Sequence, residues 1–494
     1  MLPDLISQLL APSILLTSLL GVILGIILGA LPGLTATMGI VLIIPFTYSL
    51  DVFHSFALLL AVYVSGIYGG SISAILIKTP GTPSSAATLL DGYPMAQRGE
   101  AGRAIGIATL SSFFGGIFSV IALALLSPIL SSYALRFGPA EFFALAVFGL
   151  TIIVTLSQSN LLKGAISGVV GLFIATIGID PILGCARFNF KIPQFLGGIN
   201  FVVALIGIFA MGEIFNEVEK VNVITKPVQK ITDILSSMKD ILRSWYYWLS
   251  SAIIGTFIGV LPGVGSTVAP WISYDIAKRL NKKKGLQFGH GAPEGIVATE
   301  TANNACTGGA MITLISFGLP GDVITAILIG ALMIQGLRPG PLLFSENPEI
   351  VYGIISLMFI ANIFMVIVGL LGAKFFAKTI LIPRYILSPL IVIFSIIGSF
   401  ALNNDYFDIF LMFAFGILGY LMTKYGYPKA PLILGMILGP IAESNFRRAL
   451  VIANGNYMIF INSRISFVLL TFTIISLLFS LLFAWKQGKE VKKM

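Results

Sequence analysis

Charged residues are scarce in this sequence: Asp, Glu, Lys and Arg make up 10% of its 494 residues, whereas 57% are hydrophobic. An ordinary soluble domain carries about 25% charged residues, because its surface has to be solvated. This scarcity excludes a soluble globular fold. Apolar runs at 12–31, 104–130, 350–372 and 465–485 have the length of membrane-crossing helices and lack the alternation of membrane strands. The sequence predicts an all-α polytopic membrane protein with about 11–12 transmembrane helices, some of them discontinuous.

Groups that would support catalysis or metal binding are also scarce. The two cysteines, Cys185 and Cys306, stand far apart in apolar surroundings, which favours small buried side chains over a disulfide or a metal site. The sequence has no GxxxxGK[ST] motif and no nucleophile-plus-base motif, so neither ATP-driven transport nor an intramembrane enzyme is supported. The net charge of +9 comes from loops between apolar runs, a pattern of membrane orientation rather than nucleic-acid binding. We expect no cofactor and no structural metal.

The most informative positive feature is an internal repeat. Six residues of the segment 25–37 recur at one spacing in the segment 255–267: Gly25, Gly29, Leu31, Pro32, Gly33 and Thr37 match Gly255, Gly259, Leu261, Pro262, Gly263 and Thr267. Each half then has a glycine pair before a Pro-Gly, and a glycine triplet near its end: Gly69-Gly70, Pro80-Gly81 and Gly168, Gly171, Gly178 in half one, and Gly308-Gly309, Pro320-Gly321 and Gly416, Gly419, Gly426 in half two. Matches in one order predict two copies of one unit, at about 21–184 and 251–439.

Basic residues follow different elements in the two halves. Half one carries Arg98 and Arg103 after its Pro-Gly element, whereas half two carries a basic cluster at 278–284 after its first broken segment. The equivalent places, the turn at Asp51 and the loop 338–349, are poor in basic residues. Because basic loops face the cytoplasm, equivalent loops would lie on opposite sides of the membrane. This pattern favours an inverted-topology repeat over a random scatter of charges.

These patterns divide the chain into four regions. We expect a first transmembrane repeat at 1–215, a polar amphipathic linker at 216–244, a second repeat at 245–464, and a final transmembrane helix with a basic tail at 465–494. Apolar residues of the linker have helical spacing, which predicts a helix along the cytoplasmic surface: Ile231, Ile234, Leu235, Met238 and Ile241. The basic tail predicts a cytoplasmic C-terminus.

Helix-breaking residues recur inside apolar segments of both halves. Proline removes a backbone donor and glycine permits a sharp turn, so each break should end one half-helix and begin another. Such breaks are tolerated at membrane depth where they line a cavity or are buried in protein, which favours a binding site over ordinary kinks. Free N–H groups at a half-helix start suit a carboxylate, and freed carbonyls suit Na⁺. The predicted substrate-binding residues are Gly33, Thr35, Thr37, Thr79, Gly81, Thr82, Ser84, Ser85, Gly263, Ser266, Thr267, Pro320 and Gly321, with Na⁺ near Pro32, Pro80, Pro262 and Pro320.

A polar stripe precedes the second Pro-Gly element. Glu300, Asn303, Asn304 and Thr307 stand at i, i+3, i+4 and i+7 and so share one face of a helix. Two interpretations are equally supported: hydrogen bonds that pack the bundle, or a cation or proton site. An exposed cap at the helix start is a further interpretation for Glu300. The candidates for cation coupling are Glu300, Asn303, Asn304 and Asp322.

Several runs resemble the large membrane subunit of the tripartite tricarboxylate transporter family (TctA-type). They are LPGLTATMGIVLIIPFTYSLD, GIYGGSISAILIKTPGTPSSAATLLDGYPMAQRGEAGRAIG, PEGIVATETANNACTGGAMITLISFGLPGD and GYPKAPLILGMILGPIAESNFRRAL, and the resemblance extends from about residue 15 to 465. DGYPMA and ETANN followed by GGA are its specific motifs. Members of the family usually have a small or hydroxyl residue at the position of Asp322, where a carboxylate would repel an anion unless it is protonated or binds a cation.

The resemblance implies a secondary transporter in a bacterial inner membrane. Its implied partners are a small four-helix membrane subunit (TctB-type) and a periplasmic solute-binding protein (TctC-type). Its implied substrates are citrate-like tricarboxylates and related carboxylates, taken up with Na⁺ or H⁺. An ion or small-solute channel built on duplicated broken helices is the alternative from another class. Saturable transport with counterflow would distinguish the carrier from the pore.

The charge pattern generates a topology prediction. We expect the loops at 98–103 and 278–284 to face the cytoplasm, and the loop 338–349 and the turn at Asp51 to face outward, because basic loops are retained inside. Single cysteines introduced into each loop should react with an impermeant thiol reagent in spheroplasts at the outward positions alone. Labelling of the 278–284 loop from outside would contradict an inverted repeat.

Overall fold

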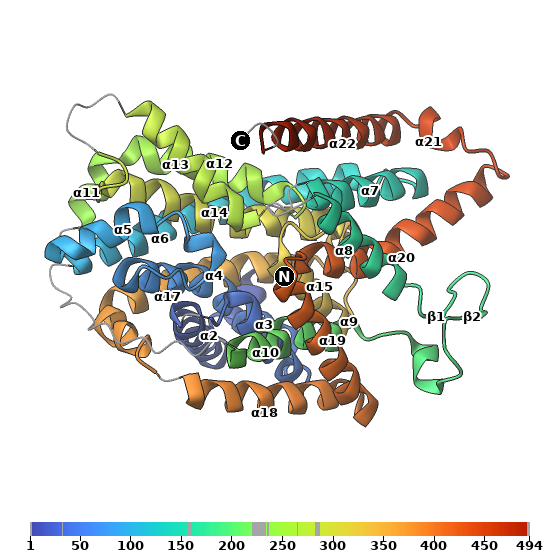
Figure 1. Ribbon diagram of the computed structural model, residues 1–494, viewed down its shortest axis with the longest axis horizontal. Helices are drawn as coiled ribbons and strands as arrows, with labels where there is room; N and C mark the ends of the chain where they lie inside the picture. The colour runs from blue at the N-terminus through green and yellow to red at the C-terminus, as the bar shows by residue number, and fades with distance from the viewer. Residues whose placement is uncertain are drawn as a thin grey trace. The chain divides into compact units, whose positions relative to one another are not determined.

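A computed structural model describes residues 2–31, 33–155, 161–219, 234, 237–263, 265–281, 287–382 and 384–491 (Figure 1). Helices dominate these residues, and their one described sheet is a two-stranded antiparallel ribbon that pairs Gly178 with Arg187 and Ile179 with Ala186. The predicted all-α class is confirmed. The chain forms two compact units: unit 1 comprises 1–131 and 217–402, and unit 2 comprises 132–216 and 403–494.

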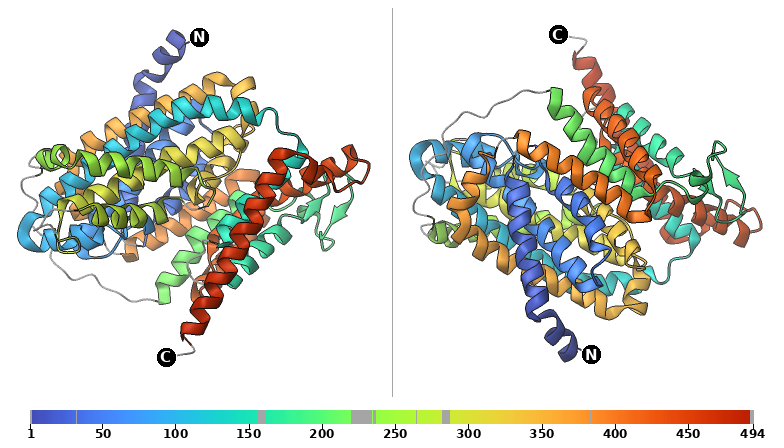
Figure 2. Two further views of the ribbon diagram at one scale, coloured as in Figure 1. Left: turned by 90° about the horizontal axis from the view of Figure 1, so that it is seen from above. Right: turned by 90° about the horizontal axis from the view of Figure 1, so that it is seen from below.

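The elements are numbered along the chain, and Figure 1 labels most of the α-helices and both strands. Those of unit 1 are α1 (Leu2–Leu9), α2 (Pro12–Ala30), α3 (Ala36–Thr47), α4 (Val52–Ile77), the 3-10 helix η1 (Pro83–Ser85), α5 (Leu89–Met95), the π-helix η2 (Ala96–Glu100), most of α6 (Ala101–Ala134), α11 (Ser237–Arg243), α12 (Trp245–Val260), α13 (Gly265–Leu280), α14 (Pro293–Phe317), α15 (Val323–Ile334), α16 (Pro341–Glu346), α17 (Pro348–Thr379) and most of α18 (Arg384–Asn403). Those of unit 2 are α7 (Pro139–Thr155), α8 (Leu161–Ile174), β1 (Gly178–Ile179), β2 (Ala186–Arg187), the 3-10 helix η3 (Pro193–Gly197), α9 (Phe201–Leu205), the π-helix η4 (Ile206–Met211), α10 (Gly212–Glu219, which crosses the boundary), α19 (Tyr406–Lys424), α20 (Lys429–Ile452), α21 (Ile459–Asn462) and α22 (Arg464–Val491), the long red helix of Figure 2.

Seven helical stretches among the described residues are long and apolar enough to cross a membrane by length and composition. They are Pro12–Ala30, Val52–Ile77, Leu89–Ala134, Phe201–Val218, Pro348–Thr379, Tyr385–Asn403 and Tyr406–Lys424. Five further apolar helices among the described residues are shorter, at 10–17 residues. The chain is therefore a multi-pass membrane protein. The polar helix α14 does not meet these criteria, and the number of 11–12 crossings stays a prediction.

Equivalent glycines bring two helix pairs together in the same way. A Cβ atom on Gly29 would lie 2.2 Å from the carbonyl oxygen of Gly66, and one on Gly259 would lie 2.5 Å from that of Cys306. Gly29 and Gly259 are 230 residues apart in the sequence, and the residues that they contact, Gly66 and Cys306, are 240 residues apart. The same offsets relate the approach of Gly69 to Ile26 and that of Gly309 to Thr256. The α2–α4 pair is thus repeated as α12–α14, with Gly69 equivalent to Gly309.

The two halves also exchange contacts reciprocally. In unit 1, α3 of half one packs on α15 of half two, while α13 of half two packs on η1 of half one. In unit 2, α8 packs on α20, while α19 packs on η4. The Asn304 Nδ2 donates to the carbonyl oxygen of Val64 at 3.3 Å, and these two positions are themselves equivalent, 240 residues apart. Self-paired equivalent positions are the property of a two-fold relation.

Hydrogen bonds group the loops into two pairs. Arg98 donates to the carbonyl oxygens of His290 and Gly291 at 2.6 and 2.7 Å. Gln335 donates to those of Thr47 and Leu50 at 3.1 and 3.2 Å. The loop 98–103 therefore lies beside residues 290–291, which follow the basic cluster at 278–284. Residues 282–284 of that cluster are outside the described residues. The turn at Asp51 lies beside the segment that precedes 338–349. The side of the membrane that each pair faces stays a prediction.

Most of the predicted linker, 220–233 and 235–236, lies outside the described residues. Its last part forms α11, in which Ile241 is buried and Met238 is 46% exposed. The Asp240 carboxylate accepts two hydrogen bonds of 2.7 Å from the guanidinium of Arg103, so α11 is fixed to the start of α6. Each compact unit combines a segment of both halves, and the predicted repeat boundaries stay a prediction.

One prediction about cysteine is wrong. Cys306 is buried in α14, as expected, but Cys185 is exposed. Cys185 lies in the short loop that joins β1 to β2, and this loop leaves its side chain uncovered.

Substitution of the helix-contact glycines should destabilise both halves. Gly29→Ala and Gly259→Ala each place a methyl group within 2.5 Å of a backbone oxygen, and such overpacking costs about 1–3 kcal/mol. Both variants should therefore unfold at lower temperature in detergent. Gly197→Ala is the control, because a Cβ there meets no atom within 4 Å. Equal melting of all three variants and the native chain would contradict the helix packing described here.

Candidate functional site

Both Pro-Gly elements break the chain in the same way. Helix α4 ends before Lys78, and α14 ends before Gly318; both residues have left-handed backbone, with φ of 60° and 72°. Four residues later, Thr82 precedes η1 and Asp322 precedes α15. The prediction that each break ends one helix and begins another is confirmed. These equivalent positions again differ by 240 residues.

In half one the new helix start is satisfied by hydroxyl groups. Ser85 Oγ donates to the carbonyl oxygen of Thr82 at 2.9 Å, and Thr82 Oγ1 lies 2.9 Å from Ser84 Oγ. Thr82 and Ser85 form a capping box, which satisfies backbone groups that the break leaves free. All three side chains are buried. The result is a small, neutral, hydroxyl-lined turn.

In half two the same turn carries a carboxylate. Asp322 Oδ1 accepts the backbone N–H of Thr325 at 2.7 Å, and the Asp322 N–H donates to Thr325 Oγ1 at 2.9 Å. Asp322 Oδ2 accepts a 2.7 Å hydrogen bond from the hydroxyl of Tyr63 in half one. Both carboxylate oxygens are thus used inside the protein. The start of α15 is already capped by an acidic side chain of the protein, so it is a poor place for a second carboxylate.

The first breaks of the two halves lie against these turns. Gly33 and Gly263 have positive φ angles of 94° and 76°. Thr35 Oγ1 accepts the N–H of Met38 at 3.2 Å and caps α3. In half two the N–H of Gly263 donates to the carbonyl oxygen of Gly321 at 2.8 Å, which joins the two breaks directly.

The predicted substrate-binding residues lie on four segments of unit 1 that contact one another in pairs, α13 with η1 and α3 with α15. The buried ones are Gly81, Thr82, Ser84, Ser85, Ser266, Pro320 and Gly321, and the half-buried ones are Gly33, Thr35, Thr37, Gly263 and Thr267. Thr79 is exposed. Of the prolines expected near Na⁺, Pro262 and Pro320 are buried and Pro80 is half-buried, while Pro32 lies outside the described residues.

Glu300 is fully buried inside α14. Thr88 Oγ1 donates to its Oε1, and Ser112 Oγ donates to its Oε2 at 3.1 Å. The side chains of Ser71 and Asn303 also lie close to this carboxylate, but neither makes a hydrogen bond of ordinary length and angle with it. The interpretation of Glu300 as an exposed cap is wrong, because α14 begins two turns earlier, at Pro293.

The neighbouring asparagines differ in their contacts. Asn304 Nδ2 donates to the carbonyl oxygen of Val64, whereas its Oδ1 has no hydrogen-bond partner among the described residues. Asn303 is fully buried, and neither its Oδ1 nor its Nδ2 has a partner in the described part of the chain. Hydrogen bonds that pack the helices therefore explain the amide nitrogen of Asn304. They explain neither the Oδ1 of Asn304 nor either polar side-chain atom of Asn303.

Sequence analysis missed a further buried carboxylate, that of Asp91. Asp91 Oδ1 accepts the N–H groups of Gly289, Gly291 and Ala292 at 2.8–2.9 Å, and its Oδ2 accepts the hydroxyl of Tyr274 at 2.9 Å. This aspartate opens the DGYPMA motif and fixes the loop that leads into α14. Thr88, Ser112 and Tyr63 were also missed. Thr88 follows the hydroxyl-rich break, which was the one local signal for it.

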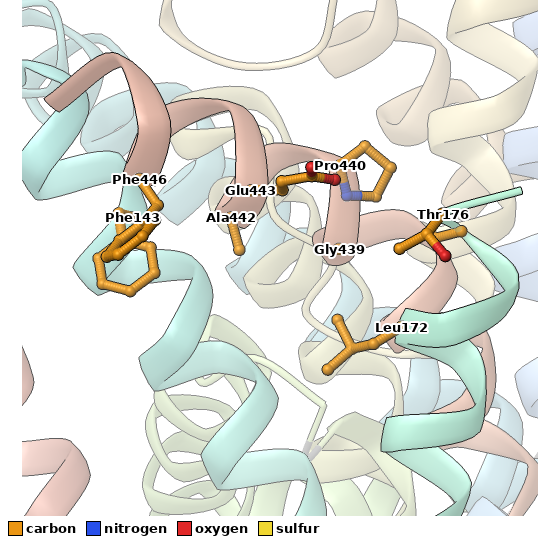
Figure 3. A pocket seen from close by; sticks show the side chains of 9 residues that line it. Phe143, Leu172, Thr176, Gly439, Pro440, Ala442, Glu443 and Phe446 are labelled. Atoms are coloured by element: carbon orange, nitrogen blue, oxygen red, sulfur yellow. The ribbon is translucent and has the colours of Figure 1, made fainter. Parts of the chain in front are cut away.

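Unit 2 holds a separate pocket of about 340 Å³, and no predicted site residue lines it (Figure 3). Its walls are mostly apolar, with the rings of Phe143 and Phe446 together on one side. Its charged residue, Glu443, accepts a 2.6 Å hydrogen bond from Arg187. Apolar walls with a carboxylate do not suit an anionic substrate. Nearby, hydrogen bonding from Arg447 holds the pKa of Asp180 well below its usual range.

Comparisons with known proteins agree over most of the chain. The family model described as "Tripartite tricarboxylate transporter TctA family" matches residues 15–434. An Agrobacterium vitis protein, "Uncharacterized 52.8 kDa protein in TAR-I ttuC' 3'region", is 38% identical over 440 residues, which cover 89% of this chain and 88% of that protein. A second protein of this organism, "Uncharacterized protein in TAR-II ttuC' 3'region", is 39% identical over 228 residues, which cover 46% of this chain and 94% of that protein. No solved structure matches the chain.

The Asp322 cap can be tested by stability. Asp322→Ala removes the acceptor for the Thr325 N–H, and loss of such a cap costs about 0.5–2 kcal/mol. Asp322→Asn keeps a carbonyl oxygen for this bond and should melt closer to the native chain. Tyr63→Phe removes the hydrogen bond to the other carboxylate oxygen, Oδ2 of Asp322. The loss of this bond should lower the stability by about 0.5–1.5 kcal/mol. If Asp322→Ala melts at the native temperature in detergent, Asp322 does not hold the start of α15.

Proposed function

Since the chain belongs to the tripartite tricarboxylate transporter TctA family, we propose that it is the large membrane subunit of a secondary carrier for carboxylates. It is a subunit of a tripartite transport system by its family and a multi-pass membrane protein by its helices. The observation that supports a carrier site is the contact among the four chain breaks in unit 1. Broken backbone at membrane depth is tolerated where it is buried in protein or lines a cavity, and transporter binding sites are built from such segments.

The two Pro-Gly turns differ in charge, and this supports a division of the site. The turn at Thr82, Ser84 and Ser85 is rich in hydroxyls, whereas the turn at Asp322 already carries a carboxyl group whose two oxygens are used inside the protein. A substrate carboxylate is therefore favoured at the turn of half one, where the hydroxyls of Thr82 and Ser84 can donate to it. Glu300, Asn303, Asn304 and Asp322 are then left for the coupling Na⁺ or H⁺.

The family supports the rest of the assembly. We infer a small membrane subunit of the TctB type and a periplasmic binding protein of the TctC type as partners, in a bacterial inner membrane with the C-terminus in the cytoplasm. Charged carboxylates are costly to desolvate. Delivery by a binding protein raises their concentration at the site. The chain on its own should transport slowly.

A channel remains the second candidate, since duplicated broken helices also build pores. The closed packing of α14, whose residues from Gly295 to Ser316 are all buried, supports a carrier with an occluded site. Single-channel currents in planar bilayers would reverse this choice.

Uptake of labelled carboxylates into proteoliposomes tests the proposal. Citrate-like tricarboxylates should accumulate saturably under an inward Na⁺ or H⁺ gradient, show counterflow, and enter faster when both partners are added. Ser84→Ala removes a hydroxyl from the half-one turn, and the loss of one hydrogen bond to a charged group weakens affinity about ten- to a hundredfold. Ser345→Ala, in an exposed position of α16, is the matched control. Equal substrate affinity in both variants would reject the half-one turn as the carboxylate site, and equal rates with and without partners would reject the tripartite assembly.

A further inference from the structure

The Glu300 carboxylate has no charged partner among the described residues. Its hydrogen bonds come from two neutral hydroxyls, those of Thr88 and Ser112. It is fully buried. An ionised carboxylate buried without a counter-charge costs several kcal/mol. Its negative charge therefore requires a positive ligand or a proton.

Polar atoms around this carboxylate are also left without partners. The Ser71 hydroxyl and both polar side-chain atoms of Asn303 are fully buried and make no hydrogen bond of ordinary length and angle in the described part of the chain, and both side chains lie close to Glu300. A proton on Glu300 would remove its charge but would leave these groups unsatisfied. A water molecule would satisfy them but would leave the charge. A bound metal cation balances the carboxylate and also accepts lone pairs from the Ser71 hydroxyl and the Asn303 Oδ1, although it leaves the Asn303 Nδ2 donor without a partner.

We propose that Glu300, Ser71, Thr88, Ser112 and Asn303 form a binding site for one Na⁺ ion. The atoms available to coordinate a cation are the oxygens of one carboxylate, three hydroxyls and one amide, and oxygen is the preferred ligand of hard cations. The described residues contain no group of three or more His, Cys, Asp or Glu that would hold a transition metal. A single carboxylate balances one positive charge, so a monovalent ion is favoured over Ca²⁺ or Mg²⁺.

The repeat has one such site. At the offset of 240 residues, Glu300 corresponds to Leu60 and Asn303 to Tyr63. The apolar Leu60 supplies no ligand, so half one lacks the site. One Na⁺ ion per chain is expected at this position.

The Na⁺ site is connected to the proposed carboxylate site. The N–H of Thr88 donates to the carbonyl oxygen of Ser85 at 3.2 Å, and the N–H of Ser85 donates to that of Thr82 at 3.1 Å. An ion that orders Thr88 therefore also orders the turn that carries Thr82 and Ser85. This step rests on the proposed function, under which the turn binds the substrate and the ion is its coupling ion.

The ion can be measured without transport. We expect Na⁺ to raise the unfolding temperature of the purified full chain in nanodiscs in a saturable manner, while K⁺ and choline at equal ionic strength have no such effect. Binding of radioactive Na⁺ should saturate at one ion per chain. Glu300→Gln should abolish both effects. Ser112→Ala should weaken Na⁺ about tenfold, since one ligand to a charged group is lost.

Ser111→Ala is the matched control for Ser112→Ala. Ser111 immediately precedes Ser112 in α6, is buried, and points about 100° away around the helix. It should leave Na⁺ binding unchanged. If Glu300→Gln does not fold, Ser112→Ala and Thr88→Ala carry the comparison.

The outcomes separate this inference from the proposed function. Unchanged Na⁺ stabilisation in Glu300→Gln, or in both hydroxyl variants, would overturn the site. Stabilisation that follows pH and ignores Na⁺ would also overturn it and would assign a proton to Glu300. Na⁺ binding that is lost in these variants, together with a failure to take up any carboxylate, would keep the site and reject the carrier.

Discussion

A helix that breaks inside an apolar protein must find partners for the backbone groups that it frees. The architecture of unit 1 follows from this requirement. Each Pro-Gly turn is closed by its own capping box, Thr82 with Ser85 and Asp322 with Thr325. The turns also need room, which glycine provides. A Cβ on Gly81 would lie 1.9 Å from the carbonyl oxygen of Gly29, and one on Gly321 would lie 2.6 Å from that of Gly259.

Duplication supplied two such turns, and sequence divergence gave them different chemistry. Thr82 and Asp322 occupy equivalent positions, yet one presents a hydroxyl and the other a carboxylate. The buried carboxylate of α14 likewise belongs to half two alone. Glu300 stands there at the position that the apolar Leu60 occupies in half one. Under the proposed function, an anionic solute is favoured at the hydroxyl-lined turn of half one, and a cation at Glu300 inside α14 of half two. Electrostatic asymmetry within a symmetric backbone is a direct way to bind two ions of opposite charge side by side.

The sequence was sufficient where the determinants are local. Composition predicts the membrane class, Pro-Gly predicts the breaks, and the i, i+3, i+4 spacing places Glu300 and Asn303 on one helix. Contacts between distant segments were not predictable. Asp91 caps a loop about 200 residues later along the chain, and nothing near it in the sequence indicates that partner. The grouping of the chain into two units likewise depends on tertiary contacts between the halves. The exposed Cys185 shows the converse error, in which an apolar neighbourhood in sequence was taken for burial.

The position of Thr88 explains how binding at one place can be felt at another. Its side chain bonds Glu300, and its backbone bonds the turn that begins at Thr82. A ligand that neutralises Glu300 changes the free energy of ordering Thr88 through its side chain. A ligand on the turn changes the same free energy through the backbone of Thr88. Linkage then requires each ligand to alter the affinity of the other by the same factor. Under the proposed function, the coupling needs no long pathway, because Thr88 contacts Glu300 through its side chain and the Thr82–Ser85 turn through its backbone.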